Sequence, residues 1–248
     1  MKDKYIAARN AYAYPPVGLC ATADQIDIHD WKTSFSEHRF DTTLQLDQYH
    51  TDCLLSDSNE LVLTGIYSVM YWGYITSGAK SVTRCTWISI GNSKNPSNSI
   101  SYIGRDTAVD IVRKSLQSLN KENYGDALLV IRQLPHVGVS FGTKFLAFMS
   151  PEYVGVLDDK ITKHLSTGSF TTILNPSVLH RLMKPKSENT KQTAARFQVF
   201  CETLNSIKIK LNQEGATWHD MSGASMGRFR ALDVERALFS IAKSADNA

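Results

Sequence analysis

The chain has 248 residues, of which 42% are hydrophobic and 21% charged, and its formal net charge is +3. This length suits one large domain or two small ones, and the mild positive charge permits a polyanionic partner without requiring one. Because no window approaches the ~18 apolar residues of a membrane span and the N-terminus lacks a signal-peptide core, we expect an intracellular, cytoplasmic protein with no membrane association.

The cysteines and the usual catalytic motifs give little indication of a cofactor. The four cysteines are far apart and form no CxxC pair, which argues against a thiolate metal site and against a disulfide framework. The sequence has no HExxH, no Walker A loop, no GxGxxG after a strand and no GxSxG elbow. We therefore expect neither a metal ion nor another cofactor.

The two parts of the chain differ in periodicity. Residues 1–57 show little helical pattern and contain the turn-like YPPVG and the polar SDSN, so we expect an irregular segment packed on the body, with at most a short strand or helix. The body, residues 58–248, opens with a predicted helix from Glu60 to about Ile75. Segment 81–90 fits either a strand or a short buried helix, and the Gly/Asn/Ser/Pro-rich residues 91–99 predict a loop.

The remainder of the body predicts a series of helices joined by loops. Apolar residues recur at helical spacing in each of them, and turn or capping residues separate them. These predicted helices cover residues 104–120, 126–134, 140–149, a stretch beginning at about Asp158, 175–183, about 188–212 and 233–244. The expected fold class is therefore mainly α, with many short helices.

A tight turn links two of these helices at LPHVG. Pro135 ends the first helix because it disfavours helical geometry before it, and Gly138 permits a tight backbone at the start of the second. Ser140 and Lys144 share one face of that second helix at i, i+4 spacing. Unpaired N–H groups at its N-terminus could bind an anion such as a nucleic-acid phosphate, but a purely structural αα-hairpin fits the same pattern.

The amino-acid sequence of this region resembles that of a known family. LPHVG followed by a helix and then VLDDKI resembles the helix-hairpin-helix DNA glycosylase superfamily, and loosely its bacterial group of 8-oxoguanine glycosylase-like proteins. Leu134, Pro135, Val137 and Gly138 match the hairpin of that family. Leu157 and Asp158 match its aspartate element, and Asp158 lies 24 residues beyond Leu134, as in endonuclease III-type members.

The resemblance implies a function and a multi-helix glycosylase-like fold. It implies an enzyme that binds double-stranded DNA, flips out a modified base and breaks its N-glycosidic bond. Within the hairpin motif, residues 126–149, it implies that a DNA phosphate is gripped by His136, Val137, Gly138 and Ser140, and Lys160 could steer the DNA backbone. In the element 156–165, Asp158 would stabilise positive charge on the sugar and orient a water. An aspartate at this place also suits a helix N-cap, and Asp159 is the reserve candidate. We expect a monomer.

The chain departs from the family pattern at two positions. His136 stands where the family has the first hairpin glycine, although histidine tolerates unusual backbone geometry better than most residues. Ser140 stands where bifunctional members carry a lysine nucleophile, and Lys144 lies one turn further on. The sequence therefore favours a monofunctional glycosylase that uses Asp158 and water, with a glycosylase/lyase that uses Lys144 as the alternative.

Aromatic and basic residues supply candidates for binding the base and the DNA backbone. Tyr71 and Trp72, with Tyr74 beside them, could stack on the flipped base, although aromatic residues in a helix are more often part of the core. Four more distant candidates have weaker support, namely Trp87, Trp218, Lys163 and the basic turn containing Arg228 and Arg230.

Three functional interpretations remain open on the sequence. The first is a DNA glycosylase that acts on an oxidised purine in repair, or on the bulky modified bases of phage DNA in antiviral defence. The second is a DNA-binding hairpin protein without catalysis. The third is an unrelated helical protein with a chance LPxVG.

Overall fold

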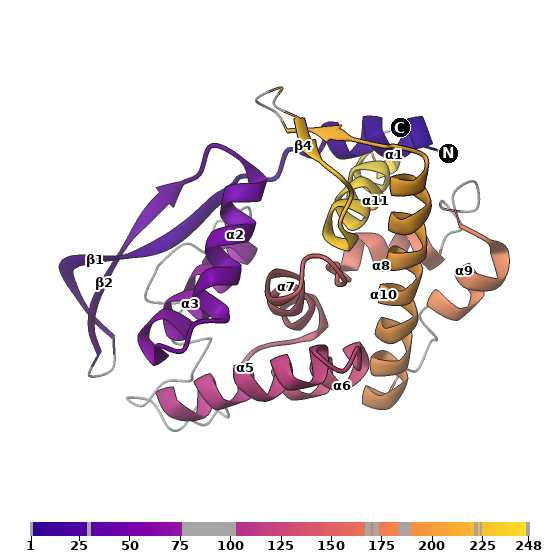
Figure 1. The fold of residues 1–248 in the computed structure, drawn as a ribbon. Coiled ribbons are helices and arrows are strands. Elements are labelled where there is room, and N and C mark those ends of the chain that lie inside the picture. The colour runs from indigo at the N-terminus through magenta and orange to yellow at the C-terminus, as the bar shows by residue number, and fades with distance from the viewer. Residues whose placement is uncertain are drawn as a thin grey trace.

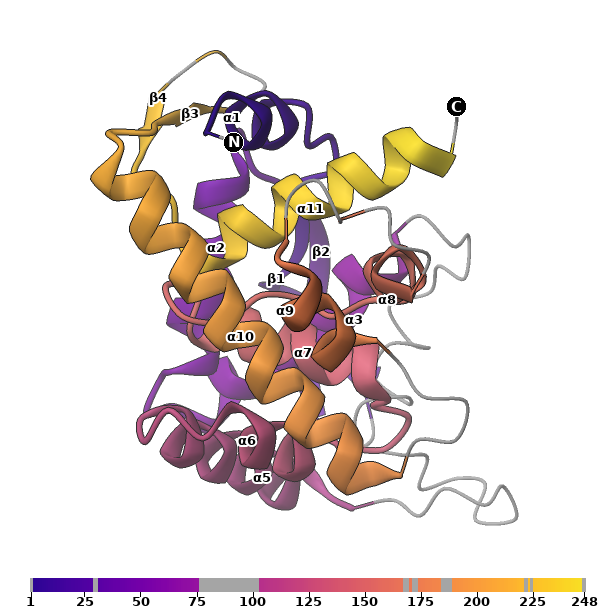
Figure 2. The same cartoon turned by 90° about the vertical axis from the view of Figure 1, so that its right-hand side faces the viewer.

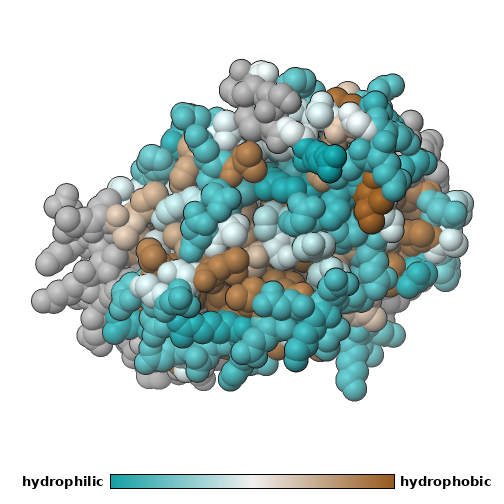
Figure 3. All heavy atoms as spheres, in the orientation of Figure 1, coloured by the Kyte–Doolittle hydropathy of each residue, from teal (hydrophilic) through white to brown (hydrophobic). Residues whose placement is uncertain are grey.

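A computed structural model describes residues 2–28, 31–75, 103–166, 170, 174–183, 189–220, 223 and 225–246. The described chain is mainly helical (Figure 1), which confirms the predicted fold class. The segments 81–90 and 91–99 lie outside the described residues. None of the described helices is long and apolar enough to cross a lipid bilayer. On the face seen in Figure 3, hydrophilic side chains surround smaller hydrophobic patches.

The helices predicted for the body are present with similar bounds. They are α3 (Asn59–Tyr74), α5 (Arg105–Leu119), α6 (Tyr124–Ile131), α7 (Val139–Met149), α8 (Asp159–Ser166), α9 (Pro176–Leu182), α10 (Thr190–Gln213) and α11 (Ala231–Asp246). Local capping explains several starts: the Ser58 side chain accepts from the Leu61 amide, and Asn189 forms a capping box with Gln192. α6 ends at Ile131 rather than at Leu134, because the residues before Pro135 already form the turn.

The first 54 residues are more regular than their sequence predicts. They form α1 (Lys2–Asn10), the antiparallel strands β1 (Val17–Ile28) and β2 (Trp31–Arg39), and α2 (Thr43–Leu54). The two strands form a hairpin that extends to one side of the helices in Figure 1. The mixed ATADQIDI stretch of β1 lacks the apolar alternation that identifies a half-buried strand, so the expectation of an irregular segment was wrong.

α7 lies at the centre of the helical body. It packs against α2, α3, α5 and α6, and most of its second half is fully buried. Figures 1 and 2 both place α5 and α6 on one side of α7 and α11 on the opposite side, with α10 running along the body. A short two-stranded sheet, β3 (Trp218–His219) and β4 (Ser225–Gly227), links α10 to α11. Both α7 and α11 contribute residues to the cavity of the candidate active site.

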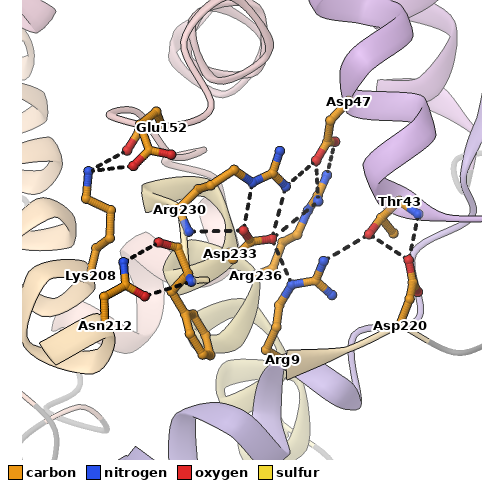
Figure 4. A network of polar contacts seen from close by, with 11 residues as sticks. Arg9, Thr43, Asp47, Glu152, Lys208, Asn212, Asp220, Arg230, Asp233 and Arg236 are labelled. Atoms are coloured by element: carbon orange, nitrogen blue, oxygen red, sulfur yellow. Dashed lines mark hydrogen bonds and ion pairs between the residues drawn. The ribbon is translucent and has the colours of Figure 1, made fainter. Parts of the chain in front are cut away.

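Buried ion pairs fasten α1 and α2 to α11 (Figure 4). Arg9 Nε donates to Asp233 Oδ1 at 3.1 Å, and Arg236 donates to both carboxylate oxygens of Asp47 at 2.8 and 2.5 Å. Arg230 joins the two acids, with Nη2 2.6 Å from Asp47 Oδ2 and Nε 2.8 Å from Asp233 Oδ2. Because these charges are largely removed from water, each depends on its partners, and the network fixes α11 relative to α2.

Candidate active site

The turn between α6 and α7 leaves the start of α7 without a side-chain cap. Leu134 and Val137 are buried beneath the turn, and the Val137 amide donates to the Leu134 carbonyl at 3.2 Å. Gly138 is the N-cap residue of α7, no side chain caps the helix, and the first intrahelical bond runs from Gly142 N to Gly138 O at 2.8 Å. The amides of the first turn of α7 are therefore oriented as an anion site requires.

His136 adopts the backbone conformation that glycine favours. Its φ is 60°, in the left-handed region, and its side chain is exposed. By contrast, Gly138 has φ −78°, and a Cβ atom added there would meet nothing within 4 Å. The structural demand for glycine thus falls on the first of the two hairpin positions, where this chain has histidine. The turn removes the His136 imidazole from water in part, and this desolvation lowers its pKa.

Asp158 is held as the N-cap of α8. Its Oδ1 accepts from the Ile161 amide at 2.8 Å, and its carbonyl accepts from the Thr162 amide at 2.9 Å. The preceding loop is tied to α7, because the Leu157 amide donates to Thr143 Oγ1 at 3.1 Å. Burial raises the pKa of the Asp158 carboxyl, while the Ile161 amide and the charge of Lys144 act in the opposite direction.

Lys144 extends its side chain back along α7 toward the start of the helix. Its Nζ donates to Ser140 Oγ at 2.9 Å and lies 5.1 Å from the centre of the Phe141 ring. This direction is the ordinary one, since helical side chains tilt toward the N-terminus. The amine therefore lies beside the hydroxyl of the residue that replaces the family lysine. Burial lowers the pKa of the Lys144 amine, so less of it is protonated at neutral pH than of an ordinary lysine.

Asp158 and Lys144 line the same cavity, of about 240 Å³. Its lining residues come from four regions: the segment after α1, the end of α3, the α7–α8 region and α11. They are Tyr12, Tyr14, Trp72, Ser140, Lys144, Val156, Asp158, Asp159, Lys160, Leu232, Glu235, Arg236 and Phe239. The cavity combines aromatic walls with two acids and an amine that have shifted pKa values, an arrangement typical of an active site.

The aromatic wall is made by residues that support one another. The Tyr14 ring lies 4.8 Å from that of Trp72, and the Trp72 ring lies 5.1 Å from that of Phe148. Tyr12 packs edge-on against Phe239 at 6.0 Å. Trp72 Nε1 also donates to the Pro15 carbonyl at 3.2 Å, which ties the segment after α1 to α3.

The remaining aromatic candidates lie elsewhere. Tyr71 neighbours Trp72 but is not among the described residues that line this cavity, because its hydroxyl is directed to the Glu37 carboxylate. Trp218 is buried in the core, with the Arg9 guanidinium 3.5 Å from its ring centre. Trp87 lies outside the described residues.

The basic candidates are mostly held by acids. Lys160 lines the cavity, but its Nζ is also 3.1 Å from Asp246 Oδ2. Lys163 reaches the other oxygen of Asp246 at 2.6 Å. Arg230 belongs to the buried network described above rather than to a basic surface turn.

Several residues of the cavity were not singled out from the sequence. Tyr12 and Tyr14 precede β1 in a segment without a recognisable motif, and nothing local indicates that they meet α7. Glu235 and Phe239 stand at i, i+4 spacing in the predicted C-terminal helix, which places them on one face. The sequence DVERALF shows this spacing, but it does not show which part of the chain packs against this face of the helix.

A comparison with family models identifies the family of this chain. The family model described as "Putative 8-oxoguanine DNA glycosylase OGG-like protein" matches residues 45–239, more than half of the chain, and the chain belongs to this family. No curated protein and no solved structure gives a significant match. The matched region includes Lys144, Asp158 and Glu235, whereas Tyr12 and Tyr14 precede it.

Proposed function

We propose that this protein is a DNA glycosylase that flips a modified base into the cavity and breaks its N-glycosidic bond. The observation that carries the proposal is the placement of Asp158 and Lys144, from the two motif elements, in one cavity with aromatic walls. A flipped base would stack on the wall formed by Tyr14, Trp72 and Phe239. The family description favours an oxidised purine such as 8-oxoguanine, and a bulky modified base of phage DNA is the second substrate class.

Asp158 is the proposed catalytic carboxylate. As the base departs, positive charge develops on the sugar, and a nearby carboxylate stabilises it or orients a water. The hydrogen bond from the Ile161 amide to Asp158 Oδ1 also restrains the carboxylate from rotating away from the cavity. Since burial raises its pKa, the activity should fall at acidic pH as this carboxyl is protonated.

The start of α7 is the proposed phosphate site. The uncapped amides of its first turn, including that of Ser140, would accept a DNA phosphate, with the exposed His136 at the edge of the turn. The Ser140 hydroxyl has a different partner, because it accepts from Lys144. Lys160, at the rim of the cavity, would add positive potential once DNA competes with Asp246 for its amine.

The test is base release from duplex DNA that carries a panel of modified bases, scored with and without alkali. Asp158→Asn should lower the rate by about 10²–10³-fold, the usual cost of losing one stabilising group of this kind. Because asparagine caps helices about as well as aspartate, the free energy of unfolding should stay within about 0.5 kcal/mol of the wild-type value. Asp110→Asn, an exposed acid on α5, is the matched control. Unchanged release by Asp158→Asn contradicts the role of Asp158, and DNA binding without release across the panel favours a non-catalytic protein.

A second candidate function is a glycosylase that also cleaves the strand through a Schiff base on Lys144. The specific observation in its favour is that the Lys144 amine reaches back to Ser140 and lines the cavity. Its lowered pKa increases the neutral fraction that can attack the sugar. Ser140 stands where bifunctional members carry their lysine, and the Lys144 amine lies 2.9 Å from its hydroxyl.

Borohydride trapping separates the two mechanisms. A covalent protein–DNA adduct that is lost in Lys144→Ala, together with strand cleavage that needs no alkali, identifies the lyase. Lys114→Ala, an exposed lysine on α5, should trap as the wild type does. Base release without any adduct, and strand cleavage only after alkali, identifies the monofunctional enzyme.

A further inference from the structure

The cavity contains a further acid to which the proposed mechanism assigns no role. Glu235 lies on the first half of α11, and only 4% of the residue is exposed. The loop before Asp158 packs directly on it: a Cβ atom added at Gly155 would lie 2.7 Å from Glu235 Cβ. The Val156 amide donates to its carboxyl group. Phe239, one turn later on the same face, lines the same cavity.

The surroundings of Glu235 contain few charges able to stabilise its ionised form. Lys144 faces it from α7, and Asp158 from the start of α8, with Asp159 and Lys160 further along the cavity lining. The Tyr12 phenol faces it from the segment after α1.

On its own helix, the neighbouring cation is already committed to another acid. The Arg236 guanidinium makes two hydrogen bonds to Asp47, at 2.8 and 2.5 Å. The second lysine of the cavity, Lys160, pairs with Asp246 at 3.1 Å, so among the described residues of the cavity Lys144 is the amine that serves both carboxyl groups.

The two carboxyl groups consequently lie in different environments. Burial raises the pKa of Glu235 well above its ordinary value, and the negative charge of Asp158 raises it further. Burial raises the pKa of Asp158 as well, but this residue is only half-buried, and the Ile161 amide and Lys144 both favour its ionised form. When the environments of two neighbouring acids separate their pKa values, one can serve as a proton donor while the other remains a carboxylate.

We propose that Glu235 is the general acid of base release, acting together with the Asp158 carboxylate that lines the same cavity. This role rests on the proposed glycosylase function. As the C1′–N bond breaks, its electron pair goes to the base, and the Glu235 O–H proton is transferred to an acceptor atom of that base. Asp158 meanwhile stabilises the positive charge left on the sugar. Water or the Lys144 amine then adds to C1′, and the proton it loses restores the acid form of Glu235.

A purely structural role for Glu235 makes different predictions. Its carboxyl could serve only to accept the Val156 amide and to fill the space opposite Gly155. In that case, Glu235→Gln would affect all substrates alike, at every pH. A general acid instead matters most for a neutral base, and not for a base that already carries positive charge, because such a base departs without protonation.

The decisive experiment is single-turnover base release by wild type and Glu235→Gln as a function of pH. Glutamine has the shape and charge of the protonated acid, so the fold should be retained. On a neutral base, we expect the variant to lose about 10²–10⁴ in rate. The wild-type rate should fall at alkaline pH as Glu235 loses its proton, and this alkaline limb should be absent in the variant. On DNA containing cationic 7-methylguanine, the variant should stay within about threefold of the wild-type rate.

The outcomes are distinguishable. Glu202→Gln, an exposed acid on α10, should behave as the wild type does. If the wild type releases the base and Glu235→Gln shows the same rate and the same alkaline limb, the role of Glu235 is overturned but the glycosylase proposal is not. An equal loss on the neutral and the cationic base also overturns it, in favour of a structural role. If the wild type releases no base at all, the glycosylase proposal fails, and this one fails with it.

Discussion

Replacing Asp47 by asparagine should cost a large part of the stability of this protein. The Asp47 side chain is 1% exposed and accepts hydrogen bonds from Arg236 at 2.8 and 2.5 Å and from Arg230 at 2.6 Å. Asparagine is nearly isosteric, so the change leaves no cavity, but it removes the negative charge that compensates two arginines. Asp233 then remains as the acid that pairs with Arg230 in this cluster.

The expected magnitude follows from the burial of the pair. Removing one partner of a buried ion pair typically costs about 3–5 kcal/mol, because the other charge is left uncompensated in a poorly solvated site. Domains of ordinary stability have only about 5–15 kcal/mol in total. Since Arg236 also lines the cavity, the variant should lose base release as well as stability.

Urea unfolding at neutral pH measures the effect. For a slope of about 2–3 kcal/mol per molar, the midpoint should fall by about 1–2 M. Asp52→Asn is the matched control, because Asp52 lies on the same helix, is exposed and accepts a hydrogen bond from Gln48. A shift for Asp47→Asn no larger than that of the control would show that the buried network does not hold α2 to α11 as argued.

Two further predictions concern histidines. Because His136 has φ 60°, His136→Gly should leave the free energy of unfolding unchanged or raise it by up to about 1 kcal/mol. His136→Val should lower it by more than about 1 kcal/mol, and urea unfolding measures both variants. A valine variant as stable as the wild type would contradict the strain at this turn. His50 is fully buried, and burial lowers its pKa to about 3. The unfolded state therefore binds a proton on His50 below pH ~6.5, whereas the folded state does not. Between pH ~6.5 and ~4.5 the free energy of unfolding of the wild type should fall by about 2 kcal/mol more than that of His50→Gln. Equal pH dependence in the two proteins would refute this.

Capping and helical periodicity allowed much of the fold to be predicted. α3, α5, α7 and α10 begin and end close to their predicted positions, because a helix start depends on residues within one turn of it. The prediction that Asp158 caps the next helix is confirmed for the same reason. The β1–β2 hairpin was missed because the apolar alternation of its strands is weak, although the two strands are consecutive in the chain.

Only those parts of the candidate site that depend on residues close together in the sequence could be predicted. The spacing from LPHVG to VLDD pointed to Asp158, and Lys144, one turn after Ser140, was kept as the alternative nucleophile. The direction of its side chain brings the amine back to Ser140. The Asp158 and Lys144 assignments, like the phosphate site at His136 and Gly138, remain predictions about function that base release and trapping will test.

The sequence was sufficient to predict the helices of the body, the turn between α6 and α7 and the carboxylate at the start of α8, since each depends on neighbours along the chain. The tertiary structure alone decided what faces that carboxylate. Tyr12, Tyr14 and Trp72 reach the cavity from one end of the chain, and Glu235 and Phe239 reach it from the other. Periodicity reveals which face of a helix is buried but not which distant element covers it, and it is this packing that shifts the pKa values of the acids and the amine.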